Sequence, residues 1–353
     1  YIDWGIYIFL SMTAIIFLSV PVYLKILNDE SHLLAVSQSM FYHQNAYLLF
    51  MSKFYHDTFH VIQNLIPNRP IGFPFLAYLA HTLNGYSYQN VFVVNFILMF
   101  LFLSGAYVVS KHFTDSLSSV AAIFLLSAYP IFTIYGASGG YDLCSTFFFY
   151  LAMVILYRYL KAPDSSIFAL LWVTLLILAN IRYESIIFFL IIIPAAITAT
   201  RRFHIKPYSY IYSLTPILLL PYIWQRFLSV GTYENPSNVP LFSFKAFWEH
   251  LGILAGNLFN LNLDLPYAGI LNMVAVAGTL YLLAKLFQGQ LKLQSFQLKF
   301  WLIFGVCLST SMIIVLSHFL GLYNHPAQAR LFFYFSIFCA LSPIVIKTLY
   351  PNL

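Results

Sequence analysis

Long runs of apolar residues, separated by short polar segments, dominate the chain. A helix needs about 20 apolar residues, with a range of roughly 17 to 25, to cross the hydrocarbon core of a bilayer. On that rule the pattern predicts an all-α polytopic membrane protein with about ten transmembrane helices. The predicted spans cover approximately residues 4–25, 88–110, 116–135, 142–160, 166–182, 184–200, 208–226, 265–287, 299–319 and 330–349.

The apolar run from about residue 166 to residue 200 is too long for a single span. Its charged residues are Arg182 and Glu184, near the middle of the run. Charged residues are costly inside the bilayer and cheap at its surface. We therefore expect a tight hairpin here, with both side chains at one membrane face.

Residues 70–87 are also apolar, but the segment is short and contains Pro and Gly. Treating it as a span would reverse the topology downstream and place the cluster Arg201, Arg202 and Lys206 outside, against the positive-inside rule. We therefore predict an interfacial or re-entrant helix.

With the N-terminus inside, the titratable residues gather at the outer face. All acidic residues except Asp3, Asp115 and Asp164 fall on that side, as do all histidines except His112 and His204. A transporter is expected to carry ionisable residues near the bilayer midplane, on two similar halves. Neither feature is evident, so the pattern favours chemistry at the outer face.

Composition agrees with a membrane protein, since 61% of residues are hydrophobic and 8% are charged. The 17 Lys and Arg residues exceed the 11 Asp and Glu residues, but they occur singly or in short loop clusters. This is the distribution that membrane topology produces, so no nucleic-acid partner is expected. Cys144, Cys307 and Cys339 lie in apolar surroundings without CxxC spacing, which predicts inert packing residues and no disulfide framework or thiolate metal site.

Two predicted outer loops are long, while most connections are short. The first covers residues 26–87 and is rich in Tyr, Phe and His; the second covers 227–264. Within the second, a turn-rich segment at 231–240 precedes a predicted interfacial helix at 244–258, which carries Trp248. We expect the two loops to roof a cavity at the membrane surface, within a single domain of residues 1–353. The alternative for most of these aromatic residues is a simple interface belt.

Several short polar motifs follow one another at the predicted outer face. They are Asp29-Glu30 after the first span, Arg69-Pro70 before the re-entrant segment, Gly85 at its end, Tyr129-Pro130 through Asp142, Arg182-Tyr183-Glu184, and Arg330 at the start of the last span. This order resembles the GT-C glycosyltransferases, and within them the protein O-mannosyltransferases and the lipid A aminoarabinose transferase. The chain departs from that pattern after the last predicted span, where many relatives carry further spans or a soluble domain.

The resemblance implies transfer of a sugar from a polyprenyl-phosphate carrier to an acceptor on the non-cytoplasmic side, with inversion at the anomeric carbon. The acceptor would be a glycolipid, a glycan or a protein. An attacking hydroxyl group must lose its proton, which requires a carboxylate within hydrogen-bond reach. The leaving phosphate must have its charge held by Arg, Lys or a metal.

By this resemblance, Asp29 is the expected general base. Glu30 is expected to be a structural or acceptor-orienting neighbour, because adjacent helical residues do not face the same way. Asp142 is expected to line the same cavity and to orient the acceptor or the base. For Asp29 and Asp142 the alternative is an acidic helix cap.

Arg69, Arg182 and Arg330 are the candidates for binding the donor phosphate, and His325 is expected to assist. Each arginine lies at a predicted outer membrane edge, where it is able either to bind a lipid phosphate or simply to snorkel to the interface. We predict that Asp29, Asp142 and at least one of the arginines converge on one outward-facing cavity.

Three other readings stay open. His56 and His60 share a helix face with Asp57 between them, a spacing that suits a divalent metal and a metal-dependent oligosaccharide transferase; otherwise no cofactor is expected. An O-antigen-ligase-like enzyme would depend on His325 and Arg330. A non-catalytic transporter of lipid-linked sugar would not need an acidic base.

The expected location is the bilayer, as a multi-pass integral protein. A high content of Phe, Tyr and Ile with little Ala points to an AT-rich genome. Together with the lack of disulfide features, this favours a bacterial inner membrane with the active site facing the periplasm.

Overall fold

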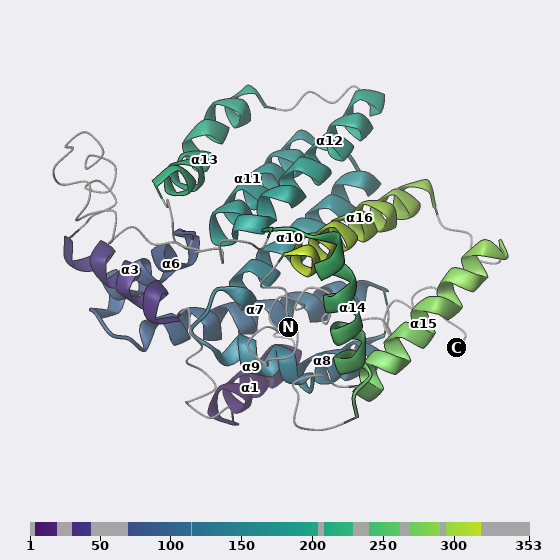
Figure 1. Ribbon diagram of the computed structural model, residues 1–353, viewed down its shortest axis with the longest axis horizontal. Coiled ribbons are helices and arrows are strands. Elements are labelled where there is room, and N and C mark those ends of the chain that lie inside the picture. The colour runs from purple at the N-terminus through teal and green to yellow at the C-terminus, as the bar shows by residue number, and fades with distance from the viewer. Residues whose placement is uncertain are drawn as a thin grey trace.

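The computed structural model describes residues 4–19, 30–43, 70–113, 115–203, 208–228, 240–261, 269–289 and 294–318. Every regular element in this part of the chain is a helix, and the β-pairing consists of one isolated bridge between Phe242 and His318. The predicted all-α class is therefore confirmed (Figure 1).

The helices form three consecutive groups along the chain. The first is α1 (Trp4–Ser19), α3 (Glu30–His43), α6 (Gly72–Asn84), α7 (Asn90–Phe113), α8 (Ser116–Ser127) and α9 (Pro130–Ala137). The second is α10 (Asp142–Lys161), α11 (Ser165–Ile181), the 3-10 turn η2 (Tyr183–Ser185), α12 (Ile186–Phe203) and α13 (Ser209–Leu228). The third is α14 (Phe244–Leu258), α15 (Gly269–Phe287) and α16 (Ser295–Ser317).

Three of the described helices are long and apolar enough to cross a membrane, judged by length and composition: Asn90–His112, Asp142–Lys161 and Ser295–Ser317. A fourth span is present if α8 and α9 count as one broken span. Shorter apolar helices occupy the other predicted spans that the structure describes, at Ile8–Ser19, Ser165–Ile181, Tyr183–Thr198, Ser213–Ile223 and Gly269–Tyr281. The full set of about ten spans stays a prediction.

One predicted span is broken. The segment 116–135 was expected to be a single helix, but α8 ends at Ser127, α9 begins at Pro130, and the two helices are bent by 70°. Tyr129 has extended backbone angles, φ −76° and ψ 115°. A proline disfavours the helical conformation of the residue before it and is well accepted at the first position of a helix, so the sequence Tyr129-Pro130 ends one helix and begins the next.

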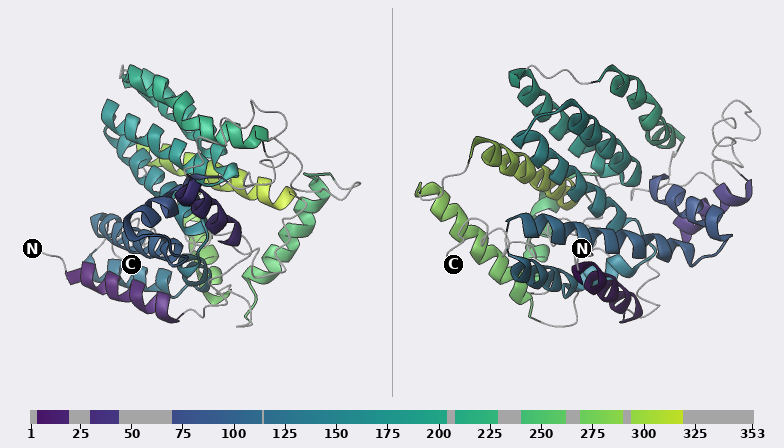
Figure 2. Two further views of the ribbon diagram at one scale, coloured as in Figure 1. Left: turned by 90° about the vertical axis from the view of Figure 1, so that its left-hand side faces the viewer. Right: turned by 180° about the vertical axis from the view of Figure 1, so that it is seen from behind.

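The helices pack around two apolar clusters that meet on α10. The first cluster contains residues of α1, α3, α6, α7, α8 and α9, the beginning of α10, and Ile181 at the end of α11. The second contains the rest of α10 with residues of α11, α12, α13 and α16. In Figure 1, α10, α11, α12 and α16 lie side by side, and the views in Figure 2 agree. The start of α10 therefore lies where the two halves of the molecule join.

Polar residues fix several helix starts at the expected loops. Asp115 caps α8 by accepting a hydrogen bond from the Ser118 amide at 2.7 Å, and Asp164 caps α11 by accepting from the Ser166 amide at 2.7 Å. A capped start satisfies amide groups that have no partner within the helix. These caps set where α8 and α11 begin.

The predicted interfacial helix at 244–258 is present as α14, with those bounds. Its buried side chains are His250 and Leu254, while Phe244 and Trp248 are exposed. One apolar face is thus open, as a helix lying at an interface requires; its position in the membrane stays a prediction. Cys144 and Cys307 are free and buried, as the sequence predicted, and Cys339 lies outside the described residues.

Candidate functional site

A buried ion pair joins the start of α10 to the end of α11. Nη1 of Arg182 lies 3.4 Å from Oδ1 of Asp142, and the side chains of the two residues are 4% and 3% exposed. Nε of Arg182 lies 3.3 Å from Oε2 of Glu184, whose side chain is 36% exposed. One guanidinium group therefore holds two carboxylates, one buried and one open to the surroundings.

The hairpin that carries Arg182 and Glu184 has the tight form that the sequence predicted. Arg182 terminates α11 in an extended conformation, φ −144° and ψ 132°, and η2 follows directly before α12 begins. The Ser185 amide donates to the Arg182 carbonyl at 3.1 Å and closes the turn. This turn puts the two charged side chains on the same side of the backbone reversal, within reach of each other.

A polar clamp from α7 holds the turn that precedes Asp142. The amide nitrogen of Asn95, which is fully buried, donates to the carbonyl oxygens of Ser138 at 2.6 Å and Gly140 at 2.7 Å. The Ser138 hydroxyl in turn accepts from the Gly140 amide at 3.2 Å. Since unpaired buried carbonyls are costly, Asn95 fixes the loop that delivers Asp142 to the end of α11. Asn95 carried no signal in the sequence, because a single Asn in an apolar helix does not reveal what it faces.

Asp142 is the first residue of α10, and the residue at the cap position is Tyr141. The ring centroid of Tyr141 lies 6.0 Å from Cζ of Arg182, within the range of a cation–π contact. The Asp142 carboxylate thus lies beside a guanidinium group that is also flanked by an aromatic face. Asp142 therefore has a buried charged partner, which a residue that only caps a helix would not need. This favours its interpretation as a site residue.

Two polar atoms near Arg182 are buried without a hydrogen-bond partner: Oδ1 of Asn180 and Oγ of Ser185. Asn180 donates through its amide nitrogen to the carbonyls of Leu176 and Leu218 at 2.9 and 2.8 Å, which fixes the orientation of the amide. Buried polar atoms are rarely left unpaired without a functional or solvent-related reason. A buried unpaired polar atom therefore lies two residues before Arg182 in the chain and another lies three residues after it.

The beginning of α6 packs against the same end of α11. At Gly72 a Cβ atom would lie 2.6 Å from the carbonyl oxygen of Asn180, so only glycine allows this approach. At its other end α6 terminates at Gly85, where φ is +75°. Gly72, three residues after Arg69 in the chain, therefore packs against Asn180, two residues before Arg182.

A histidine not singled out by the sequence lies in the field of Glu184. Burial lowers the pKa of His318, the Glu184 carboxylate acts to raise it, and His250 acts to lower it further. His318 is the residue after α16, and the Nδ1 atom of His250 lies 2.7 Å from the Leu316 carbonyl oxygen. The end of α16 is therefore joined to α14 through His250 and lies within electrostatic reach of Glu184. The enrichment of histidine at the outer face was the available signal, but it did not distinguish His318 from the others.

The structure describes little of the remaining expected site residues. Glu30 is the first residue of α3, although its side chain is outside the described part. The others lie outside the described residues: Asp29, His56, Asp57, His60, Arg69, His325 and Arg330. In the described ranges, no group of three or more His, Cys, Asp or Glu side chains is arranged to hold a metal ion. The convergence of Asp29 with the arginines stays a prediction.

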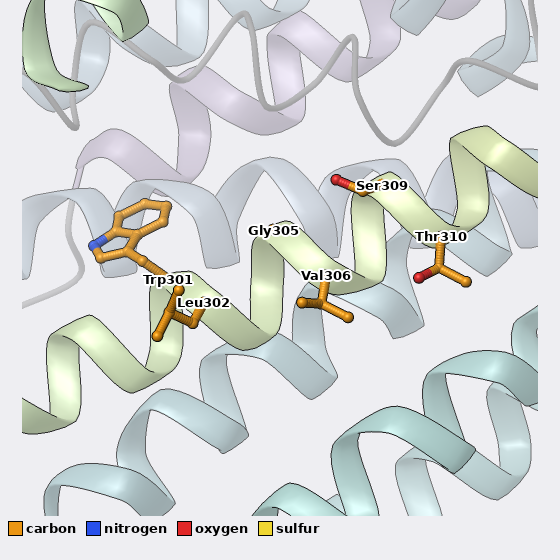
Figure 3. Close-up of a pocket in the computed structure, with 6 residues that line it drawn as sticks. All are labelled: Trp301, Leu302, Gly305, Val306, Ser309 and Thr310. Carbon is orange, nitrogen blue, oxygen red and sulfur yellow. The ribbon is translucent and has the colours of Figure 1, made fainter.

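A shallow groove of about 450 Å³ runs along α16, as Figure 3 shows. Its lining residues all belong to this one helix: Trp301, Leu302, Gly305, Val306, Ser309 and Thr310. None of these side chains ionises, and neither Asp142 nor Arg182 contributes to the groove. The groove therefore has no part in the charged site.

The fold and the ion pair together define the class: an all-helical membrane protein with a charged site where α10 begins and α11 ends. Residues 68–224 match the family model of dolichyl-phosphate-mannose-protein mannosyltransferases, a family of the GT-C superfamily. The matched segment contains α6, Asp142, Arg182 and Glu184, so the resemblance inferred from the motifs is confirmed over these residues. The matched segment covers less than half of the 353 residues and suggests a GT-C glycosyltransferase. No curated protein and no solved structure gave a significant match.

Proposed function

We propose that this protein transfers a sugar from a polyprenyl-phosphate carrier to an acceptor hydroxyl at the non-cytoplasmic face of the membrane. The observation that carries the proposal is the position of the Arg182–Asp142 pair inside the segment that matches the mannosyltransferase family. A buried charged pair at the shared end of two apolar helices is costly, and function is a common reason for keeping one there.

In the proposed reaction the acceptor oxygen bonds to the anomeric carbon while the bond from that carbon to the phosphate oxygen breaks. The bonding electrons leave with the phosphate, and the acceptor proton goes to the carboxylate of Asp29. Attack from the face opposite the leaving group inverts the anomeric centre. Asp29 is proposed as the base because it directly precedes α3, which packs on α6, in the position of the family's acidic motif.

The ion pair suits a supporting role beside that base. Arg182 already contacts two carboxylates, and this arrangement favours fixing Asp142 and Glu184 over holding a donor phosphate alone. Asp142 would then orient the acceptor or the base, while the more open Glu184 would meet the acceptor. Arg182 remains able to contribute long-range positive charge to the leaving phosphate.

Arg69 is the proposed principal phosphate ligand, with Arg330 and His325 as further contributors. Chain connectivity supports this choice, because three residues of extended chain span at most about 11 Å. The Cα atom of Arg69 therefore lies within about 11 Å of the Cα atom of Gly72. Gly72 packs against Asn180 at the end of α11. A cation in this region would neutralise the charge that develops on the leaving phosphate.

The bacterial inner membrane, with the site facing the periplasm, is the proposed location. The acceptor is proposed to be a glycolipid, a glycan or a protein that carries a free hydroxyl. No metal is assigned to the reaction, and the pair His56 and His60 is kept as the candidate that a chelator would test.

The proposed function is tested by incubating purified protein in lipid nanodiscs with a panel of polyprenyl-phosphate sugars and hydroxyl acceptors, with and without chelator. We expect transfer that chelator leaves unchanged, and NMR of the product should give the anomeric configuration opposite to that of the donor. Retention of configuration, or donor movement across the bilayer without transfer, would contradict the proposal. Loss of transfer with chelator would replace it by a metal-dependent mechanism.

A further inference from the structure

A buried histidine links α3, α6 and α7. His81 of α6 is 0% exposed, and its Nε2 atom lies 3.2 Å from the hydroxyl oxygen of Ser37 on α3. Its Nδ1 atom lies 2.9 Å from the amide nitrogen of Asn90, the first residue of α7. Phe41 of α3 and Tyr86 surround the ring, with centroid distances of 6.0 and 5.0 Å. The imidazole therefore links α3 and α7 to α6 by hydrogen bonds, in addition to the apolar packing of Leu33 in the core.

The contacts determine which nitrogen of His81 carries the proton. The amide nitrogen of Asn90 also donates to the Gly85 carbonyl at 2.8 Å, so it must be the donor toward Nδ1 of His81. Nδ1 is then an acceptor and the ring proton is on Nε2. The Ser37 hydroxyl donates to the Leu34 carbonyl at 2.9 Å, so its oxygen is available to accept from Nε2. The network is complete for the neutral imidazole with hydrogen on Nε2.

A second proton on His81 would break this arrangement. It would place an N–H group on Nδ1 directly opposite the N–H group of Asn90, and turning the amide would set its oxygen against the Gly85 carbonyl. The charge would also be enclosed at a fully buried position, where it is poorly solvated. Consistent with this, burial lowers the pKa of His81.

We propose that His81 positions α3, which begins at Glu30 directly after Asp29, and that it does so only as the neutral imidazole. On acidification α3 detaches from α6, and Glu30, its first residue, loses the anchor to α6. The role in transfer rests on the proposed function, because it takes Asp29 as the base. The attachment of α3 does not depend on that assignment.

Among the side chains that the structure describes, few other ionisable groups lie near His81. Among the described side chains in contact with His81, the phenol of Tyr86 is the ionisable one. On α3 the titratable residues are Glu30, His32, Tyr42 and His43, whose side chains are outside the described part. The ionisable groups at the end of α7, Lys111 and His112, lie about six turns from Asn90 along the helix. His81 is therefore the group to vary.

The test is hydrogen–deuterium exchange of the α3 segment in the full-length protein in nanodiscs, from about pH 7.5 to about pH 5.5. At a pH between the lowered pKa of His81 in the folded protein and its higher pKa in the open form, opening of α3 should take up one proton. We therefore expect its amide protection factors to fall by up to about tenfold per pH unit below about pH 6.5. In His81→Gln, which keeps a side-chain donor without titrating, this pH dependence should vanish.

Two further variants keep the result clear. His112→Gln, a change of an exposed histidine at the end of α7, should retain the pH dependence of the wild type. Ser37→Ala removes the acceptor on α3, so its α3 protection should already be low near pH 7.5, with little further change on acidification. In parallel, the transfer rate of the wild type should fall over the same pH interval, while that of His81→Gln should not.

The exchange and transfer measurements separate the two proposals. Protection of α3 that is independent of pH in the wild type, or equally dependent on pH in His81→Gln, would overturn the role of His81 even if transfer occurs. Exchange as predicted without transfer from any donor would leave the attachment of α3 standing and reject the proposed function.

Discussion

Arg182 and Asp142 lie 40 positions apart in the chain, yet their side chains meet at 3.4 Å where α10 begins and α11 ends. The hairpin of these two helices makes them antiparallel, so the first residue of one and the last of the other face the same side. The pair anchors both the turn from α11 to α12 and the loop that enters α10.

Removing the guanidinium group should destabilise the protein. In Arg182→Ala the buried Asp142 carboxylate loses a positive partner, and such a loss typically costs about 3–5 kcal/mol of the free energy of unfolding. Arg182→Lys should recover part of the stability, because it restores the charge without the planar fork. Thermal unfolding in detergent measures both effects.

The exposed pair between Lys245 and Glu249 is the matched control. These groups lie 3.8 Å apart, with side chains 85% and 59% exposed. Lys245→Ala should cost less than about 1 kcal/mol, because exposed ion pairs contribute little. Equal losses for Lys245→Ala and Arg182→Ala would contradict the importance of the buried pair.

The apolar pattern was sufficient to predict much of this arrangement. It predicted α7, α10 and α16, the hairpin between α11 and α12, and α14, because the length and charge of a segment decide these features. The pattern failed at Tyr129-Pro130, where one predicted span became two helices. Helix α12 continues through Pro194, and α13 continues through Pro216, so a proline in the sequence does not by itself reveal where a helix breaks.

The site was less predictable than the fold. Asp142 and Arg182 were identifiable as charged residues at an outer edge, and their proximity depends on a short hairpin. The roles of Asn95 and His318 depend on which faces of distant helices meet, and an apolar sequence does not encode that in any local motif. The family match suggests the class of reaction but says nothing about these contacts.

Substituting Asn95 should disturb the site through the loop that it holds. Asn95→Ala leaves the buried carbonyl oxygens of Ser138 and Gly140 without this donor, at a cost of about 1–3 kcal/mol for each carbonyl that finds no other partner. The transfer rate should fall further than the folded fraction does, because Asp142 follows this loop. Parallel unfolding and transfer assays on the purified variant measure the difference.

Ser104, on the same helix, offers a control for Asn95. Its hydroxyl is buried and makes no hydrogen bond, so Ser104→Ala should be neutral or slightly stabilising. If Asn95→Ala behaves like Ser104→Ala, the clamp on the 138–140 loop has no consequence for the site.

Gly72 should not tolerate a side chain. In Gly72→Ala the new Cβ atom would meet the Asn180 carbonyl at 2.6 Å, and the backbone must move to relieve the clash. We expect destabilisation of about 1–3 kcal/mol. We also expect weaker donor binding, because Arg69, the proposed phosphate ligand, precedes Gly72 by three residues in the chain. Gly105→Ala is the comparison, because no atom lies within 4 Å of its added Cβ and it should be neutral or stabilising. Similar behaviour of the two variants would argue against close packing of α6 on α11.

The cap of α11 should make stability depend on acid. Hydrogen bonds from the amides of Ile167 and Ser166 lower the pKa of Asp164. The contribution of Asp164 to the free energy of unfolding is therefore present above its pKa of about 3.9 in the unfolded chain. It is lost as the pH falls through the lower pKa that Asp164 has in the folded protein. Asp164→Asn retains a capping side chain and should show a smaller decrease in the unfolding midpoint between about pH 5 and about pH 3. Glu249→Gln should retain the wild-type decrease; an Asp164→Asn profile identical to it would contradict the cap's role.

Asp29, the acidic residue before α3, is proposed to take the acceptor proton in a transferase reaction. The most direct measurement is single-turnover sugar transfer by Asp29→Asn beside the wild type in nanodiscs, with donor binding and thermal unfolding followed on the same samples. We expect turnover to fall by at least about a hundredfold, in line with general-base catalysis, while donor binding and the unfolding midpoint are retained. Turnover equal to that of the wild type would contradict the account and remove Asp29 as the base.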